Sequence, residues 1–226
     1  MEDNRNKYVG YPHKLNGNTL KWIALLSMLI DHIGAVLLSG GSHSLFSVYS
    51  LCRGIGRIAF PIFCFLLVEG FCHTSNVKKY ILRMLGFACV AEIPYDLAFY
   101  GKIVKLDGQN VMFTFVIALV VLMLVGKREK VSGDWWAFVL AGCALAWFFS
   151  TDGSFFGIVL IWVFYDFRES HLYRNVIAGV TMCWQPASLF ALPLVEGYNG
   201  ERGRGSKYFF YWFYPLHLFV LWLLAR

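Results

Sequence analysis

The sequence contains little charge. Only 15% of its 226 residues are charged, whereas 58% are hydrophobic. Soluble globular domains contain about 25% charged and about 45–50% apolar residues, so this composition excludes an ordinary soluble domain. The apolar residues form long continuous runs and do not alternate with polar residues, which favours membrane helices over a β-barrel. We therefore expect an all-α, polytopic transmembrane helix bundle.

Common catalytic and metal-binding motifs are also lacking. The chain has no CxxC, HExxH, GxSxG, P-loop or GxGxxG motif. Its six cysteines lie inside or beside apolar runs, as small buried hydrophobic residues do, and we expect neither a metal site nor a disulfide framework. The polar N-terminal stretch is followed by no small-residue cleavage site, so we expect no cleavable signal. A net charge of +6 is typical of basic cytoplasmic loops and predicts no nucleic-acid partner.

Nine hydrophobic segments are candidate membrane spans. They cover residues 19–39, 54–73, 78–100, 110–126, 135–150, 154–167, 172–185, 186–198 and 208–225. The sixth, seventh and eighth are shorter than the roughly 20 residues that cross a bilayer. Tilted, re-entrant or merged segments therefore remain alternatives, and the count stays between eight and ten. With no linker or internal repeat, residues 1–226 are expected to form one domain.

The distribution of basic residues predicts the orientation. Lys and Arg precede the first and ninth segments and follow the second, fourth and sixth, whereas the loops STDGS and WQPAS contain none. Lys102 and Lys105 break this pattern. By the positive-inside rule, the N-terminus is expected in the cytoplasm and the C-terminus outside. The expected location is a bacterial-type inner or cytoplasmic membrane, with membrane lipids as partners.

Polar residues inside the apolar runs mark a candidate site. The stretch LSMLIDHIGAVL places Asp31 and His32 past the middle of the first segment, where a central Asp costs about 2.5–3.5 kcal/mol. Such residues usually serve a function. The nine-span topology places a larger polar set in the outer half of the membrane: Asp31, His32, Arg53, Arg57, Glu92, Asp96, Asn110, Thr114, Asp152 and His217.

Two pairs of ionisable residues each share a helix face. Arg53 and Arg57 are four residues apart, as are Glu92 and Asp96, and Pro94 between the two acids is expected to kink the helix. The arginine pair and the carboxylate pair are predicted at similar depth. They would form either a structural ion network or a binding site, and Arg57 favours the second because a guanidinium fork also holds a carbonyl or phosphate.

Asp31 and His32 are expected to have different partners. Adjacent residues on a helix point about 100° apart, so Asp31 is predicted to pair with Arg53 or Arg57 and not to orient the His32 ring. His32 would then face a cavity, the alternative being that a neighbouring helix satisfies the ring. His217, beside Tyr214 in the last segment, carries a weaker signal, since aromatic neighbours more often indicate packing.

Five stretches in order resemble a known family. They are LKWIALLSMLIDHIGAVLL, RGIGRIAFPIFCFLLVEGFCHTSNVKKYILRM, AEIPYDLAF, NVMFTF and YFFYWFYPLHLFVLWLL. Together they resemble the TraX family, whose founding member N-acetylates F pilin, over nearly the whole chain. The pilin substrate belongs to plasmid-borne members. The chain is more distantly similar to membrane acyltransferases of the O-antigen acetylase type, which use an intramembrane histidine.

The resemblance implies an acetyl-CoA-dependent acyltransferase. It would move an acetyl group from cytoplasmic acetyl-CoA to an amine or hydroxyl outside, on a peptide N-terminus, a glycan or a small molecule. His32 would act as general base or become transiently acetylated. Arg57, Asn110 or Thr114 would steady the oxyanion. The alternatives are a proton-coupled transporter, because buried acids and histidines also form proton relays, and a non-catalytic membrane assembly factor.

The expected site residues fall into three groups. The catalytic residues would be His32, Asp31 and Arg57. The residues expected to bind the acceptor are Arg53, Glu92, Asp96, Asn110, Thr114, Tyr214 and His217. The basic residues expected to bind the phosphates of CoA are Lys78, Lys79, Arg83, Arg128, Arg202 and Arg204.

Overall fold

The computed structural model describes residues 14–39, 43–126 and 134–226, and helices dominate these residues. In chain order they are α1 (Gly17–Leu37), α2 (His43–Gly56), α3 (Ala59–His73), α4 (Val77–Tyr100), α5 (Val111–Val125), α6 (Trp135–Phe148), α7 (Ser154–Asp166), α8 (His171–Met182), the 3₁₀ helix η3 (Pro186–Phe190), α9 (Ala191–Glu196) and α10 (Lys207–Leu224). The all-α prediction is confirmed for these residues.

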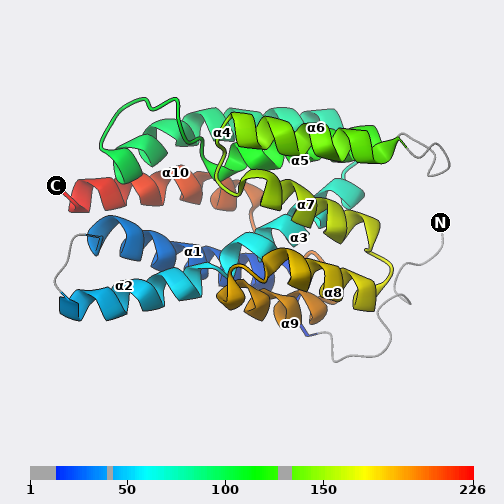
Figure 1. Ribbon diagram of the computed structural model, residues 1–226, viewed down its shortest axis with the longest axis horizontal. Coiled ribbons are helices and arrows are strands. Elements are labelled where there is room, and N and C mark those ends of the chain that lie inside the picture. The colour runs from blue at the N-terminus through cyan, green and yellow to red at the C-terminus, as the bar shows by residue number, and fades with distance from the viewer. Residues whose placement is uncertain (1–13, 40–42, 127–133) are drawn as a thin grey trace.

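The helices lie roughly along the long axis of the molecule (Figure 1). The left half of the view contains most of α1, α2 and α10 and the second part of α4, and the right half contains α3, the first part of α4 and α5 to α9. Fully buried apolar residues such as Leu20, Ile62, Leu119 and Phe164 join α3, α5 and α7 to α1.

Two of the described helical segments are both long enough and apolar enough to span a membrane. Among the described residues, Gly17–Leu37 and Phe46–His73 are long and apolar enough to cross a bilayer. The helices α5 to α8 have 15, 14, 13 and 12 residues, which gives them lengths of about 18–23 Å against a hydrocarbon core of about 30 Å. The described residues form a helical bundle with two helical segments that could cross a membrane, and the count of nine crossings stays a prediction.

The second helical segment begins earlier than predicted. The predicted span starts at residue 54, whereas α2 starts at His43 and supplies one more helix that packs along α1. Because α2 contains several serines and glycines, its first part does not form an apolar run in the sequence. Close packing stabilises it instead: a Cβ atom on Gly34 would lie 2.7 Å from Cβ of Cys52, and one on Gly56 would lie 2.2 Å from Cβ of Asp31. Small residues at these crossings let the backbones approach.

The helical geometry is interrupted between α2 and α3. Arg57 N–H and Ile58 N–H donate to the carbonyls three residues back, on Gly54 and Ile55, at 3.2 Å each. Pro61 follows in the first turn of α3, where its missing N–H would otherwise have bonded the Arg57 carbonyl. The break places Arg57 within the candidate span Phe46–His73, and not at the start of a span as predicted.

The tips of the short helices meet at the level of this break (Figure 1). Asn110 caps α5 and donates its side-chain amide to the carbonyl of Ala88 in α4 at 2.9 Å. The turn between α6 and α7 packs against it, with the N–H of Asp152 donating to the carbonyl of Gln109 at 2.8 Å. The predicted place of this turn at the outer edge of the membrane stays a prediction. In the structure the start of α5 satisfies backbone groups of the turn.

Two glycines of α2 test the packing between α1 and α2. We expect Gly56→Ala to destabilise the protein by about 1–3 kcal/mol, because the added Cβ has no room beside Asp31. Gly54→Ala is the matched control, since nothing lies within 4 Å of a Cβ at that position. The melting temperature of the purified protein in detergent measures both. Equal melting temperatures for the two variants would contradict this packing.

Candidate functional site

An ion pair joins α1 to the break after α2. The carboxylate of Asp31 accepts a hydrogen bond from Nη1 of Arg53 at 2.7 Å and one from Nη2 of Arg57 at 3.2 Å. Nε of Arg57 donates to the carbonyl of Arg53 at 3.2 Å. The Asp31 side chain is only 13% exposed. The predicted pairing of Asp31 with the arginines is therefore confirmed, and the predicted pairing of the arginines with Glu92 and Asp96 is not observed.

Next to Asp31, His32 points toward α10. Its Nδ1 lies 2.7 Å from Nε2 of His217, and both side chains are buried. Nδ1 of His217 lies 2.8 Å from the carbonyl oxygen of Phe213. Phe99 of α4 packs edge-on against the His32 ring, with the ring centres 5.4 Å apart. His217 was predicted to bind substrate, but the structure places it against His32 and not on the wall of a cavity.

A small cavity of about 140 Å³ lies beside His32. Asp31, Arg57 and Asp152 supply its charged walls, and Trp184 and Gln185 in the turn between α8 and η3 close another side. The sequence prediction placed Asp152 among the polar residues but gave it no role, and it missed Trp184 and Gln185. No sequence signal beyond the turn WQPAS pointed to them. The cavity brings the predicted catalytic residues His32, Asp31 and Arg57 together.

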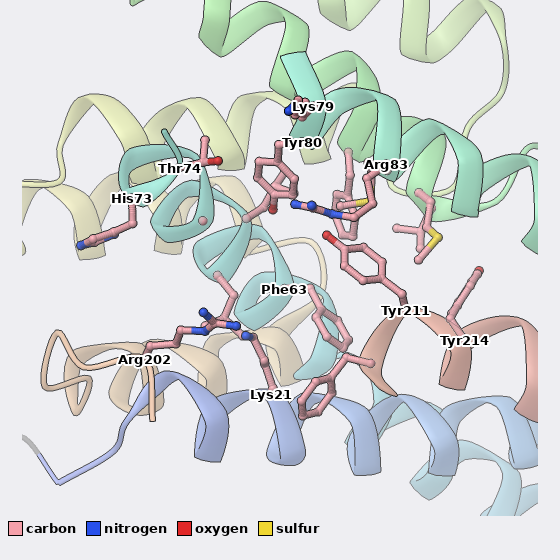
Figure 2. A pocket seen from close by; sticks show the side chains of 18 of the residues that line it. Lys21, Phe63, His73, Thr74, Lys79, Tyr80, Arg83, Arg202, Tyr211 and Tyr214 are labelled. Atoms are coloured by element: carbon pink, nitrogen blue, oxygen red, sulfur yellow. The ribbon is translucent and has the colours of Figure 1, made fainter. Parts of the chain in front are cut away.

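A larger cavity of about 510 Å³ lies among α1, α3, α4, α5 and α10, and Figure 2 shows it from close by. Four basic side chains line it: Lys21, Lys79, Arg83 and Arg202. Three of these were predicted to bind the donor, whereas Lys21 was missed although it sits in the first turns of the first apolar run. Lys78 and Arg204 do not line the cavity. Arg128 lies outside the described residues.

Three elements position these basic residues around the cavity (Figure 2). Asn76 caps α4 by accepting from the N–H of Lys79 at 2.9 Å, which fixes the helix turns that carry Lys79 and Arg83. The loop before α10 is tied to the start of α1, where the N–H of Gly17 donates to the carbonyl of Glu201 at 2.7 Å. That backbone bond holds Arg202 opposite α4.

Arg83 has an unmet donor inside this cavity. Its Nε is buried and finds no hydrogen-bond partner within the described part of the chain. The guanidinium lies over two aromatic rings, 5.5 Å from the centre of Tyr80 and 5.8 Å from that of Tyr211. Both rings face it in Figure 2. An arginine that lines the cavity suits an anionic ligand such as a phosphate, because its guanidinium group stays charged and can donate two parallel hydrogen bonds.

The two cavities adjoin. Met28, Phe63, Val111, Phe115 and Tyr214 line both of them. These residues are uncharged and largely apolar, so the basic cavity and the cavity at His32 share an apolar wall. A ligand with anionic groups at one end and a flexible apolar arm suits such neighbouring cavities, because its charges can stay at the basic end.

Four predicted acceptor residues hold helices together instead. Asn110 gives its amide hydrogens to Ala88 and to the carboxylate of Glu92, and Asp96 accepts from the backbone N–H of Lys105 at 2.6 Å. The Thr114 hydroxyl bonds the α6–α7 turn. None of these four lines either cavity. Asn110 and Thr114 therefore have no free donor for an oxyanion, which corrects their predicted role; Tyr214 does line both cavities, as expected.

Comparison with known proteins identifies the family. The family model described as TraX protein matches residues 16–225. The chain belongs to the TraX family. It is also similar to a protein of Dichelobacter nodosus described as probable fimbrial assembly protein FimC, serogroup H1, with 31% identity over 235 residues that cover 89% of this chain and 92% of the relative. No solved structure matches. The resemblance seen in the sequence is thereby confirmed.

The two arginines of this TraX-family chain separate stability from function. Arg53→Met and Arg57→Met each remove one charge-assisted hydrogen bond to Asp31, so we expect each to cost about 1.5–3 kcal/mol of stability. The double variant leaves Asp31 without a counter-charge, and we expect about 3–5 kcal/mol. Thermal unfolding measures these values.

Activity should distinguish the same two variants, because Arg57 lines the cavity at His32 and Arg53 does not. We expect Arg57→Met to lose more activity than Arg53→Met at similar stability. Equal activity in the two variants would show that both arginines serve the fold alone.

Proposed function

We propose that the chain is an integral membrane acetyltransferase, which moves an acetyl group from cytoplasmic acetyl-CoA to an amine or hydroxyl on the outer side. One observation carries the proposal: a cavity lined by Lys21, Lys79, Arg83 and Arg202 adjoins a second cavity lined by His32. Acetyl-CoA has several phosphates at one end and its thioester at the other. A basic pocket, an apolar wall that it shares with the second cavity, and a buried histidine match that order of groups.

The proposed topology agrees with this direction of transfer. With nine crossings, the N-terminus inside and the C-terminus outside, the start of α4 and the loop before α10 face the cytoplasm. Lys79 and Arg202 lie in these two segments, so the basic cavity would open where acyl-CoA is made. The expected membrane is the bacterial inner or cytoplasmic membrane.

The proposed chemistry requires one proton acceptor and one oxyanion donor. His32 takes the proton from the acceptor amine or hydroxyl as the acceptor attacks the thioester carbonyl. Arg57, held by Asp31, still has guanidinium hydrogens for the oxyanion of the tetrahedral intermediate. When the intermediate collapses, the C–S bond breaks, His32 returns the proton to the leaving sulfur, and free CoA and the acetylated acceptor result.

The similarity to a fimbrial assembly protein supports a fimbrial subunit as one acceptor, beside a glycan or a small molecule. A proton-coupled carrier or a non-catalytic assembly factor would also tolerate buried acids and histidines. Neither explains why a cavity lined by four basic side chains adjoins one lined by a histidine. The enzyme is therefore the function that this geometry supports best.

Removal of the base tests the proposal. We expect His32→Ala to lower acetyl transfer by ~10²–10⁴-fold, because a general base contributes about that much to the rate. The protein should still fold and bind CoA, although the lost hydrogen bond to His217 is expected to lower its melting temperature. Purified protein incubated with radiolabelled acetyl-CoA gives the rate from label in the acceptor or from release of free CoA. Turnover of the variant near that of the wild type would exclude His32 as the base.

Two neighbouring lysines test the donor site. Lys79 lines the basic cavity and Lys78 does not, although both lie in the first turn of α4. We expect Lys79→Gln to raise KM for acetyl-CoA by about tenfold, the effect of one charge-assisted bond to phosphate, and Lys78→Gln to leave it nearly unchanged. The KM of both variants at fixed ionic strength measures this. Equal effects would mean that only general surface charge attracts the donor.

A further inference from the structure

The contact between His32 and His217 is an edge-to-edge hydrogen bond. The two ring planes lie within 4° of each other. Nδ1 of His32 and Nε2 of His217 are 2.7 Å apart, which is closer than stacked ring faces approach. The rings therefore share a plane, and the lone pair of one nitrogen receives the N–H of the other along the direction that hydrogen bonds prefer.

A backbone carbonyl fixes which nitrogen carries the proton. Nδ1 of His217 lies 2.8 Å from the carbonyl oxygen of Phe213, and a carbonyl can only accept. Nδ1 of His217 must therefore carry a hydrogen. In the neutral ring this leaves Nε2 of His217 as an acceptor, and Nδ1 of His32 must donate to it. The reverse arrangement would place two acceptors against each other.

The same chain of bonds leaves Nε2 of His32 with its lone pair. This nitrogen has no hydrogen-bond partner in the described part of the chain, and it lies on the side of the ring away from Nδ1. His32 lines the small cavity while His217 does not, and Nε2 is the ring nitrogen of His32 that the bond to His217 leaves free. A general base needs this protonation state, with a bare nitrogen facing the reacting groups.

We propose that His217 is a positioning residue, which holds His32 in the tautomer that presents a bare Nε2 to the cavity. The inference rests on the proposed acetyl transfer and adds a role for a residue that touches no substrate. In Ser–His–Asp enzymes a carboxylate does this work. Here Asp31 is bound to Arg53 and Arg57 and is unavailable, so a second imidazole, anchored on its own helix backbone, takes that place.

Two substitutions at residue 217 separate positioning from packing. His217→Gln keeps a side-chain acceptor for the N–H of His32, and we expect kcat within about tenfold of the wild type. His217→Leu removes the acceptor while filling a similar space, and we expect kcat to fall further, toward the roughly 10⁴-fold loss that a wrong tautomer causes in a triad. The KM for acetyl-CoA should stay unchanged in both, because His217 lines neither cavity.

A spectroscopic measurement tests the tautomer without any activity. NMR of protein labelled with ¹⁵N-histidine reports which ring nitrogen carries hydrogen. Among the signals of the six histidines, those of His32 and His217 are identified by their loss in the His32→Ala and His217→Leu variants. We expect hydrogen on Nδ1 of both His32 and His217 in the wild type, and loss of that state at His32 in His217→Leu.

The outcomes separate the two proposals. Hydrogen on Nε2 of His32, or a doubly protonated His217, would overturn the positioning role, as would equal kcat losses in His217→Gln and His217→Leu. If the wild type transfers no acetyl group although NMR finds the expected tautomers, the proposed function fails and the hydrogen-bond assignment stands.

Discussion

The ion pair between Asp31 and the two arginines sets the geometry of the site. A buried carboxylate needs counter-charges, and Arg53 and Arg57 supply them from the end of α2 and the break that follows it. This requirement fixes how α1 turns against α2, and Gly56 leaves the room for it. Because the next residue on a helix points about 100° away, His32 then faces α10 and the cavity. Of the two adjacent residues, Asp31 thus binds α1 to the arginines, whereas His32 lines the small cavity.

The half-length helices bring polar backbone to the level of His32. Inside a bilayer, non-helical backbone is tolerated only where protein covers it or where it lines a cavity. Here the side chains of Asn110, Thr114 and Thr151 bond backbone groups at the α5 start, in the α6–α7 turn and at the end of α6, and the turns contribute Asp152 and Gln185 to the cavity wall.

The helices and the polar cluster could be predicted from the sequence, whereas the roles of several residues could not. Apolar runs located α1, α4 and α10 within a few residues, and helical spacing predicted the pairing of Asp31 with an arginine. The start of α2 was missed because packing through Gly34 and Gly56, and not an apolar run, stabilises it. Asn110 and Glu92 were assigned to the acceptor because depth alone cannot tell a side chain that spans two helices from one that faces a cavity. The bond between His32 and His217 joins residues 185 positions apart, and no local pattern encodes it.

The central claim is that a CoA arm reaches the junction of the two cavities, and one cysteine tests it most directly. Met28 lines both cavities, whereas Leu26, two residues earlier on α1, is 52% exposed on the outside of the bundle. Purified Met28→Cys and Leu26→Cys proteins are treated with the pyridyl disulfide of CoA, and mass spectrometry counts the CoA adducts above those of the wild type with its six native cysteines. The account predicts rapid CoA attachment at residue 28, which acetyl-CoA blocks, and little at residue 26. Attachment at residue 28 that is no faster than at residue 26, or that acetyl-CoA does not slow, would contradict a donor path that ends at His32.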